Sequence, residues 1–344
     1  MQPKLFKVRQ DGTGQLIDAY GRVVRDLRIS ITDRCNFRCS YCMPEEGMKW
    51  LDRPELLSFV EIERVVKVLI EHYNFESVRL TGGEPTVRAQ LPLLVEKLAK
   101  IKTPSGKALD LSLTTNGATL RLLASDLKNA GLSRINISLD TLRQDRFIEL
   151  TKRDQLHNVI SGIHAAVEAG LQPVKINTVV MRGVNDDELV EIVRFAREIG
   201  VIARFIEFMP LDGDNSWAPS QVVPATEIVQ KVTESFPAKQ ISHGSDPAKR
   251  YVFDDQKGEF GVIASVTIPF CDACDRIRLT ADGKIRNCLF AVEEQDIKTI
   301  LRGNGSDDDL AQVFENSAKS KWAGHSIGNV NFIRPKRSMS QIGG

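Results

Sequence analysis

All six cysteines of the chain fall into two short groups, and this spacing constrains the protein more than any other feature of its sequence. The groups have the patterns C-x3-C-x2-C and C-x2-C-x13-C, formed by Cys35, Cys39, Cys42, Cys271, Cys274 and Cys288. The chain is too poor in cysteine for a secreted disulfide scaffold, and clustered thiols of this kind are typical of zinc or iron–sulfur ligation. Buried free thiols are the other interpretation.

Each group offers three thiolates, which disfavours zinc. Structural zinc takes four protein ligands, and no histidine lies at ligand spacing from either group; the histidines are His72, His157, His164, His243 and His325. A four-iron cluster held by three thiolates keeps one iron open to a ligand from outside the protein. Two open clusters in one chain indicate chemistry rather than electron relay.

The composition restricts the class of protein. In 344 residues, 46 Lys and Arg against 45 Asp and Glu give a formal net charge of +1, so no overall field favours nucleic acid or an acidic membrane. With 42% hydrophobic residues the chain can bury a core, and its length is compatible with two domains. No apolar run reaches the roughly 18 residues of a membrane span, and the polar start of the chain has no signal core. We expect a globular, cytoplasmic protein with neither nucleic acid nor membrane as a partner.

Apolar, β-rich segments alternate with helical patterns along the first part of the chain. The expected strands are Leu27–Thr32, Val78–Thr81, Leu111–Thr115, Ile135–Asp140, Val174–Val180 and Arg204–Met209. Between them, apolar residues recur at the i, i+3, i+4, i+7 spacing of an amphipathic helix, as at Ile62, Val65, Val66 and Leu69. This alternation predicts an α/β fold with a parallel sheet, either a partial barrel or a doubly wound sheet.

Side-chain parity distinguishes these two architectures. Parallel strands covered on both faces normally read as continuous apolar runs, yet here a polar set alternates with the apolar one. That polar set is Arg28, Ser30, Thr32, Arg79, Thr81, Ser112, Thr114, Asn136, Ser138, Lys175 and Asn177. We therefore predict a partial, open (β/α)6 barrel whose wet lumen holds an anionic ligand. Arg204 and Met209 have opposite parity, so both can face the lumen only if a bulge or the strand end lies between them.

The pattern changes near Ala225. Two helical stretches, Ile228–Phe236 and Asp309–Ala318, flank Gly- and Asp-rich segments that contain the second cysteine group. This divides the chain into residues 1–20, to which we assign no role, a barrel core over 21–224, and a C-terminal region over 225–344. That region carries the second cluster and ends in the Gly343–Gly344 pair.

The motifs resemble those of one family. The first cysteine group follows the first strand in Thr32–Pro44, and it resembles the cluster loop of the radical S-adenosylmethionine superfamily. Gly82-Gly83-Glu84-Pro85 resembles the glycine-rich segment of the same superfamily, although it could also be an ordinary β/α turn. The segment Cys271–Arg278 with Cys288 is similar to the C-terminal cluster of the GTP 3′,8-cyclase family. The likeness extends from about Arg25 to Gly344.

The resemblance implies an activity and two kinds of cofactor. In this family a [4Fe–4S] cluster chelates S-adenosylmethionine and, on reduction, yields a radical that takes hydrogen from ribose C3′ of GTP. The product, (8S)-3′,8-cyclo-7,8-dihydro-GTP, begins molybdenum cofactor biosynthesis, and a second [4Fe–4S] cluster meets the guanine base. Positions carried over for S-adenosylmethionine are Tyr41, Gly83, Ser138 and Met209. Those carried over for GTP are Arg28, Arg79, Thr114, Lys175, Arg204, Arg276, Ile277 and Arg278.

The family also implies partners and a role for the C-terminus. The expected partners are an electron donor of the flavodoxin or ferredoxin type and, downstream, cyclic pyranopterin monophosphate synthase, for a protein that is a monomer or homodimer. We expect Gly343 and Gly344 to reach into the active-site cavity, where the lack of a side chain avoids clashes. The alternatives are a peptide-modifying radical enzyme with an auxiliary cluster, and a non-enzymatic iron–sulfur or zinc protein.

Overall fold

The structure is a computed structural model that describes residues 14–44, 48–211, 217–242, 244, 246–325, 327 and 332–343. Its strands are β1 (Leu16–Ile17), β2 (Val23–Val24), β3 (Asp26–Ser30), β4 (Ser77–Thr81), β5 (Asp110–Thr115), β6 (Arg134–Ser138), β7 (Val174–Val180), β8 (Ile202–Glu207), β9 (Ala238–Ile241), β10 (Lys249–Phe253), β11 (Glu259–Ile263), β12 (Arg276–Leu279), β13 (Lys284–Arg286) and β14 (Gln295–Asp296). Its α-helices are α1 (Phe59–Tyr73), α2 (Leu91–Ala99), α3 (Ala124–Asn129), α4 (Gln144–Thr151), α5 (Leu156–Glu168), α6 (Leu189–Ile199), α7 (Ala225–Ser235), α8 (Lys298–Arg302), α9 (Asp307–Lys319) and α10 (Met339–Ile342).

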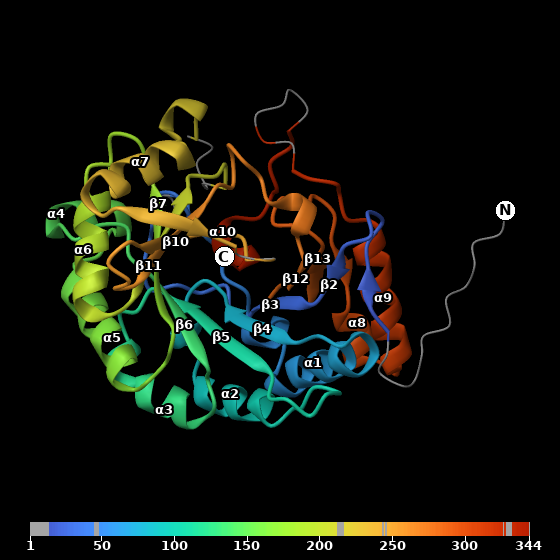
Figure 1. The fold of residues 1–344 in the computed structure, drawn as a ribbon. Coiled ribbons are helices and arrows are strands. Elements are labelled where there is room, and N and C mark those ends of the chain that lie inside the picture. The colour runs from blue at the N-terminus through green and yellow to red at the C-terminus, as the bar shows by residue number, and fades with distance from the viewer. Residues whose placement is uncertain are drawn as a thin grey trace.

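Strands β3 to β8 run parallel in sequence order and form the middle of a sheet. Helices α1 to α6 lie around the outside of these strands, and α10 lies within the ring (Figure 1). The sheet ends at β14 on one side and β9 on the other, so within the described residues the barrel does not close. The predicted partial, open β/α barrel is confirmed.

The helices form where the apolar periodicity predicts them. Ser58 caps α1 by accepting a hydrogen bond from the main-chain N of Glu61, and Asn74 ends the helix in the left-handed conformation. The acidic run at Asp307 begins α9, whose cap is Ser306. The apolar faces of these helices pack on the apolar faces of the strands to give one continuous hydrophobic core.

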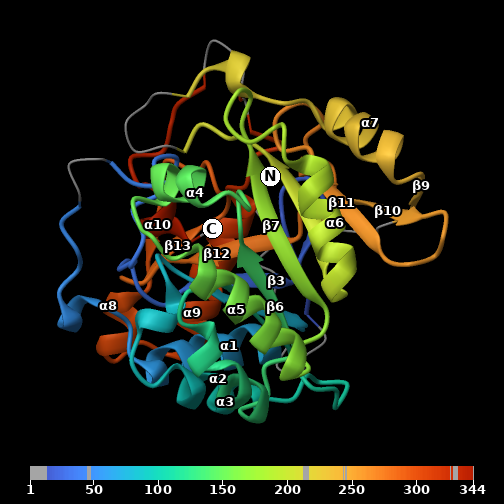
Figure 2. The same cartoon turned by 90° about the vertical axis from the view of Figure 1, so that its left-hand side faces the viewer.

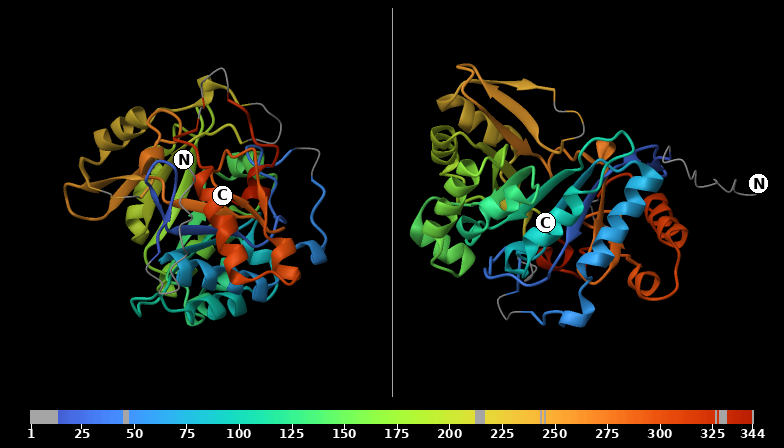
Figure 3. Two further views of the ribbon diagram at one scale, coloured as in Figure 1. Left: turned by 90° about the vertical axis from the view of Figure 1, so that its right-hand side faces the viewer. Right: turned by 90° about the horizontal axis from the view of Figure 1, so that it is seen from below.

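The C-terminal region extends the barrel sheet at both edges. On one edge β12 pairs in parallel with β3, and on the other β11 pairs in parallel with β8. Antiparallel strands β13 and β14 continue the first edge, and β10 and β9 continue the second. The two extensions lie on opposite sides of the molecule, one beside α7 and the other beside α8 and α9 (Figure 3). The sequence pattern predicted the helices of this region but not that its strands flank the core on both sides.

The loop that follows β3 packs against α4. The main-chain N atoms of Arg38 and Ser40 donate hydrogen bonds to the carbonyls of Thr151 and Leu150. Helix α4 lies at the same end of the barrel as α10 in the side view (Figure 2). This is the end at which the parallel strands finish and where β/α proteins place their active sites.

No helix among the described residues combines the length and the apolar character needed to cross a membrane.

Candidate functional site

A cavity of about 310 Å³ lies inside the barrel, and all six cysteines line it. The first group approaches from the loop after β3, and the second from the segment before β12 and the turn after β13. The two groups, remote in sequence, therefore face one space. None of the six thiols forms a disulfide.

The glycine-rich segment after β4 packs on the main chain of the first cysteine loop. The N atom of Gly83 donates to the carbonyl of Thr32 at 2.7 Å, and the N atom of Glu84 donates to that of Arg34 at 2.8 Å. A Cβ on Gly83 would lie 2.4 Å from the carbonyl oxygen of Asp33 and 2.5 Å from that of Arg34, so no larger residue fits. This contact explains the glycine whatever ligand the segment also meets.

Carboxylates surround the first cysteine group. Glu84 is buried and accepts hydrogen bonds from Thr86, Thr115 and the main chain of Asn116, which ties the ends of β4 and β5 together. Asp140 accepts a hydrogen bond from the Tyr41 hydroxyl at 2.5 Å, and burial raises the pKa of this carboxyl to about 6. Sequence analysis did not single out Asp140, which follows β6 as Glu84 follows β4.

The thiols of the first group resist ionisation in the protein alone. Burial raises the pKa of Cys35 to about 11, and the charge of Glu84 adds to the effect. Burial also raises the pKa of Cys42 to about 12. Main-chain N–H groups of Phe37 and Ser340 nevertheless donate to Cys35 and Cys42. A positively charged metal centre would stabilise these thiolates, as iron does in a cluster.

Cations surround the second cysteine group. Burial would raise the pKa of Cys274, but the charges of Lys321 and Arg276 lower it to about 7. Lys321 is buried, and its Nζ donates to the carbonyls of Arg276 at 2.6 Å and Asn287 at 2.9 Å. The ammonium group therefore joins β12 to the turn that carries Cys288.

The β1–β2 hairpin anchors the loop of Cys271. The buried Arg22 guanidinium donates to the carbonyls of Cys271 at 2.7 Å, Ala323 at 2.8 Å and Trp322 at 2.5 Å. Its Nε pairs with the buried carboxylate of Asp18 at 2.5 Å. Sequence analysis assigned no role to residues 1–20 and placed Arg22 in the barrel core over 21–224, because nothing local in this hairpin points to a contact with the second cysteine group.

Both groups fit the three-thiolate sites that a four-iron cluster requires. Within each group the thiols lie close enough for the charge of one to raise the pKa of another. Among the described residues, no group of three or more His, Cys, Asp or Glu side chains is arranged to hold a single metal ion. Three cysteines are the protein ligands that a four-iron cluster with one open iron takes.

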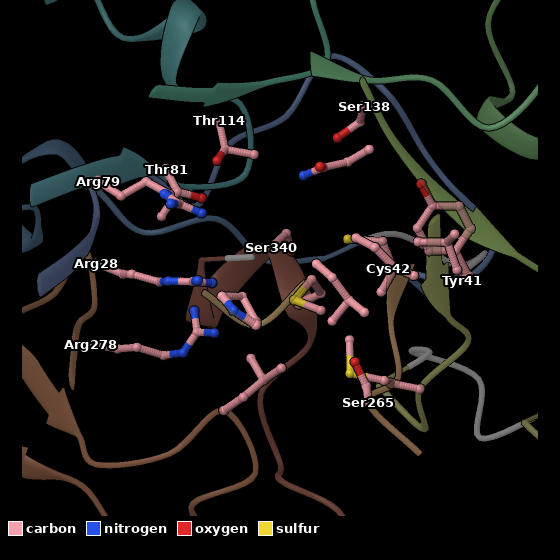
Figure 4. A pocket seen from close by; sticks show the side chains of 18 of the residues that line it. Arg28, Tyr41, Cys42, Arg79, Thr81, Thr114, Ser138, Ser265, Arg278 and Ser340 are labelled. Carbon is pink, nitrogen blue, oxygen red and sulfur yellow. The ribbon is translucent and has the colours of Figure 1, made fainter. Parts of the chain in front are cut away.

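Three arginines lie side by side across adjacent strands. Arg278 on β12 pairs in register with Arg28 on β3, which pairs with Arg79 on β4. Their guanidinium groups point into the cavity opposite Cys42 and Tyr41 (Figure 4). Among the described residues, the side chain of Arg28 makes no hydrogen bond or ion pair, and its Nε is buried without a partner. Burial, together with repulsion from its neighbours, lowers the pKa of Arg28 to about 9, so it remains a cation near neutral pH.

Most of the remaining predicted site residues line the cavity, but Lys175 and Ile277 do not. Those that line the cavity are Thr114, Ser138, Arg204, Met209 and Arg276. Strand β8 ends at Glu207, before Met209, so Arg204 and Met209 face the same space despite their opposite parity. Lys175 does not line the cavity but lies 3.8 Å from Asp246, which also pairs with Arg204. The side chain of Ile277 belongs to the hydrophobic core, so only its main chain is available to a ligand.

The C-terminal segment reaches the wall of this cavity, which Met339 and Ser340 line, and the entry of the paired glycines stays a prediction. Arg278 donates a hydrogen bond to the carbonyl of Gly343, and Ser340 lines the cavity (Figure 4). Gly343 has φ +85°, and a Cβ there would lie 3.0 Å from side-chain atoms of Ser30 and Thr81. The second glycine, Gly344, lies outside the described residues.

Comparison with known proteins is consistent with these features. Residues 29–196 match the model of the Radical SAM superfamily, and residues 201–327 match that of Molybdenum Cofactor Synthesis C. The chain is 47% identical to a GTP 3′,8-cyclase of Streptomyces coelicolor over 338 residues, which cover 97% of this chain and 98% of that protein. It is 44% identical to a GTP 3′,8-cyclase of Corynebacterium glutamicum, covering 97% of this chain and 90% of that protein.

The chain belongs to the GTP 3′,8-cyclase family. Among solved structures it resembles Streptococcus suis SuiB bound to its precursor peptide SuiA, with TM-score 0.61 and 16% identity over 89% of this chain and 70% of that one. It also resembles anSMEcpe with bound AdoMet, with TM-score 0.54 and 18% identity over 78% of this chain and 75% of that one. At these identities the likeness concerns the fold alone. The curated relatives in the GTP 3′,8-cyclase family do not favour the peptide-modifying alternative.

Proposed function

We propose that the chain cyclises GTP to (8S)-3′,8-cyclo-7,8-dihydroguanosine 5′-triphosphate, the first step of molybdenum cofactor biosynthesis. The observation that carries this proposal is the row Arg278, Arg28 and Arg79, which faces the same cavity as both cysteine groups. Adjacent, poorly paired guanidinium groups in a buried space are suited to a polyphosphate, because each binds phosphate oxygens through its planar fork. The names of the curated relatives supply the nucleotide and the product.

The first cysteine group would hold the [4Fe–4S] cluster that is a cofactor of the radical SAM superfamily. When bound, this cluster and S-adenosylmethionine supply the radical that removes the C3′ hydrogen of the ribose. Tyr41, Gly83, Ser138 and Met209 would bind S-adenosylmethionine beside it. The Tyr41 hydroxyl is held by Asp140, and the close contact of Gly83 with the cysteine loop fixes the edge of this half of the cavity.

The second group would hold a second [4Fe–4S] cluster next to the guanine base. Arg276 and Arg278 lie on β12 beside the second cysteine group. The Cζ atom of Arg276 lies over the ring of Phe270, 4.9 Å from the ring centroid. Arg28, Arg79, Thr114 and Arg204 would bind the rest of the nucleotide, with Lys175 next to Arg204 and the main chain of Ile277 between the two β12 arginines. Cations on fixed strands would hold the ribose at a defined position relative to the first cluster, and such positioning contributes strongly to reaction rates.

The wider setting follows from the same chemistry. We propose that the barrel core spans residues 21–224, and that residues 225–344 supply the second cluster and the C-terminal tail. Two groups of reduced thiols require a reducing compartment, for which the cytoplasm is suited. A flavodoxin or ferredoxin type of donor would provide electrons, and cyclic pyranopterin monophosphate synthase would take the product, whether the protein acts as a monomer or a homodimer.

Binding of GTP to the cluster-loaded protein tests the proposal. Removing one partner of a desolvated charge pair costs roughly 2–5 kcal/mol, so Arg28→Ala should weaken GTP binding by tens of fold in calorimetry. Arg182→Ala removes an exposed arginine that pairs with Glu227 at the surface and serves as the matched control. Equal affinity of Arg28→Ala and wild type, with both cluster-loaded and folded, would contradict the proposal. So would a failure of the anaerobic wild type to form cyclised product from GTP.

A further inference from the structure

Two further cations of the barrel, Arg204 and Lys175, pair with a carboxylate that the sequence analysis did not single out. Asp246 lies between β9 and β10, and its Oδ2 is 3.2 Å from Nη2 of Arg204 and 3.8 Å from Nζ of Lys175. Its Oδ1 accepts a hydrogen bond from the main-chain N of Ala248 at 3.0 Å, which orients the carboxylate. Arg204 lines the cavity together with Pro247, whereas Lys175 is joined to Arg204 through Asp246.

Asp246 is the counter-ion of these buried cations. The side chains of Arg204 and Lys175 are 5% and 13% exposed, and such charges are costly to bury without a partner. Burial would raise the pKa of Asp246, but Arg204, then Lys175 and Arg79, lower it overall, so the carboxylate stays ionised. The charges of Arg204 and Asp246 also shift the pKa of Arg79, which Arg204 lowers and Asp246 raises. Strands β5, β6 and β7 separate Arg79 on β4 from Arg204 on β8 in the sheet, so the ion pair lies across the barrel from the row of Arg278, Arg28 and Arg79.

We propose that Asp246 determines specificity for the length of the polyphosphate. A nucleotide whose base lies at the second cysteine group extends its phosphates along the arginine row, toward Arg204. Its last phosphate and the Asp246 carboxylate then compete for the same two cations, Arg204 and Lys175. A third phosphate displaces Asp246 from them, while a shorter chain stops before them and leaves the ion pair intact. The inference rests on the proposed function, which brings a triphosphate into the lumen.

Calorimetry with Asp246→Asn measures this competition. The variant keeps the size of the side chain and removes its charge, so GTP should bind about tenfold or more tightly than to wild type, because like charges in a buried site repel strongly. GDP should gain less than threefold, roughly, because it does not reach the ion pair. Asp255→Asn is the matched control: Asp255 follows β10 and pairs with Arg197 at the surface, and this variant should leave both affinities unchanged. All variants are compared as cluster-loaded protein.

Two further binding experiments distinguish a failure of this inference from a failure of the proposed function. Inorganic triphosphate carries the charge without the nucleoside, so it should also bind more tightly to Asp246→Asn, even if wild type fails to bind GTP. Measurements with and without Mg²⁺ address a role for Asp246 in holding a metal–nucleotide complex. Unchanged or weaker binding of both triphosphates in Asp246→Asn would overturn the inference, as would a loss of affinity confined to buffers that contain Mg²⁺. An equal gain for GDP and GTP would overturn it as well.

Discussion

The first cysteine group lies among carboxylates, whereas the second lies among cations, although both line the same cavity. Glu84 and Asp140 add to the burial that raises the thiol pKa values around Cys39. Lys321 and Arg276 lower the pKa of Cys274 instead. The polypeptide therefore places more positive charge around Cys274 than around the first group, where Arg38 lowers the pKa of Cys35 but does not outweigh burial.

This difference shows what each site relies on. At the first site the compensating charge would come from the metal of a cluster and from a cationic ligand such as the sulfonium of S-adenosylmethionine. At the second site buried side chains hold the thiolates and orient the loops that carry them, as outer residues do around other metal centres. Changes to each site should accordingly have separate consequences.

Removing one thiol from each group tests that separation most strongly. Cys39→Ala should lower the iron content by about half and abolish cleavage of S-adenosylmethionine. Cys274→Ala should lose a similar amount of iron but retain cleavage, while cyclised product disappears. The measurements are iron analysis and anaerobic assays of 5′-deoxyadenosine and of product. Identical behaviour of the two variants would show that the sites do not have separate roles.

The next largest effect is expected at Arg22, which should support the second site alone. Arg22→Met leaves the carbonyls of Cys271, Trp322 and Ala323 without their donor and leaves the buried carboxylate of Asp18 without its counter-ion. Breaking a buried pair in this way costs about 3–5 kcal/mol, so the second cluster should be lost or weakly held.

The electron paramagnetic resonance signals of the two reduced clusters provide the measurement for Arg22→Met. Signal from the first cluster and cleavage of S-adenosylmethionine should persist, and Arg143→Met, which changes a surface arginine paired with Asp187, is the control. Loss of both signals together would mean that Arg22 supports the whole fold rather than one site.

The sequence predicted local patterns well and remote contacts poorly. The strand positions and the inward-facing Arg28 and Arg79 follow from alternation, which each strand carries within its own few residues. Arg22 and Cys271 are 249 positions apart in the sequence. Asp246 lies in the connection between β9 and β10, far in sequence from Lys175 on β7. No local pattern indicates either contact. The parity of Lys175 was compatible with the lumen, but this residue does not line the cavity and instead pairs with Asp246, whose position depends on tertiary packing.

A smaller effect is expected at the C-terminal tail, which touches both halves of the cavity. Ser340 contacts Cys42 of the first group, and Arg278 beside the second group binds the carbonyl of Gly343. Gly343→Ala introduces a Cβ at φ +85° against Ser30 and Thr81, at a cost of about 1–2 kcal/mol. Product formation should fall about tenfold.

Iron content and the affinity for GTP should change little in Gly343→Ala. Gly106→Ala also places a Cβ at positive φ, but nothing lies within 4 Å of it, so it controls for backbone strain alone. Equal turnover of Gly343→Ala and wild type would mean that the tail is a passive occupant of the cavity.

The smallest effect is expected in the pH dependence of GTP binding, which tests whether Lys175 contributes to the cationic half of the cavity. Burial, then repulsion from Arg204, lowers the pKa of Lys175 to about 8. A bound triphosphate favours the charged lysine and raises this pKa, so binding takes up a proton once the pH exceeds about 8. The affinity for GTP should therefore fall about fourfold between pH 7 and pH 8.5. Lys175→Arg, whose guanidinium has an intrinsically higher pKa than an ammonium, should remove most of that fall when calorimetry is repeated across the same pH values. If the decline persists unchanged in Lys175→Arg, the titrating group lies elsewhere and Lys175 does not take part in binding the triphosphate.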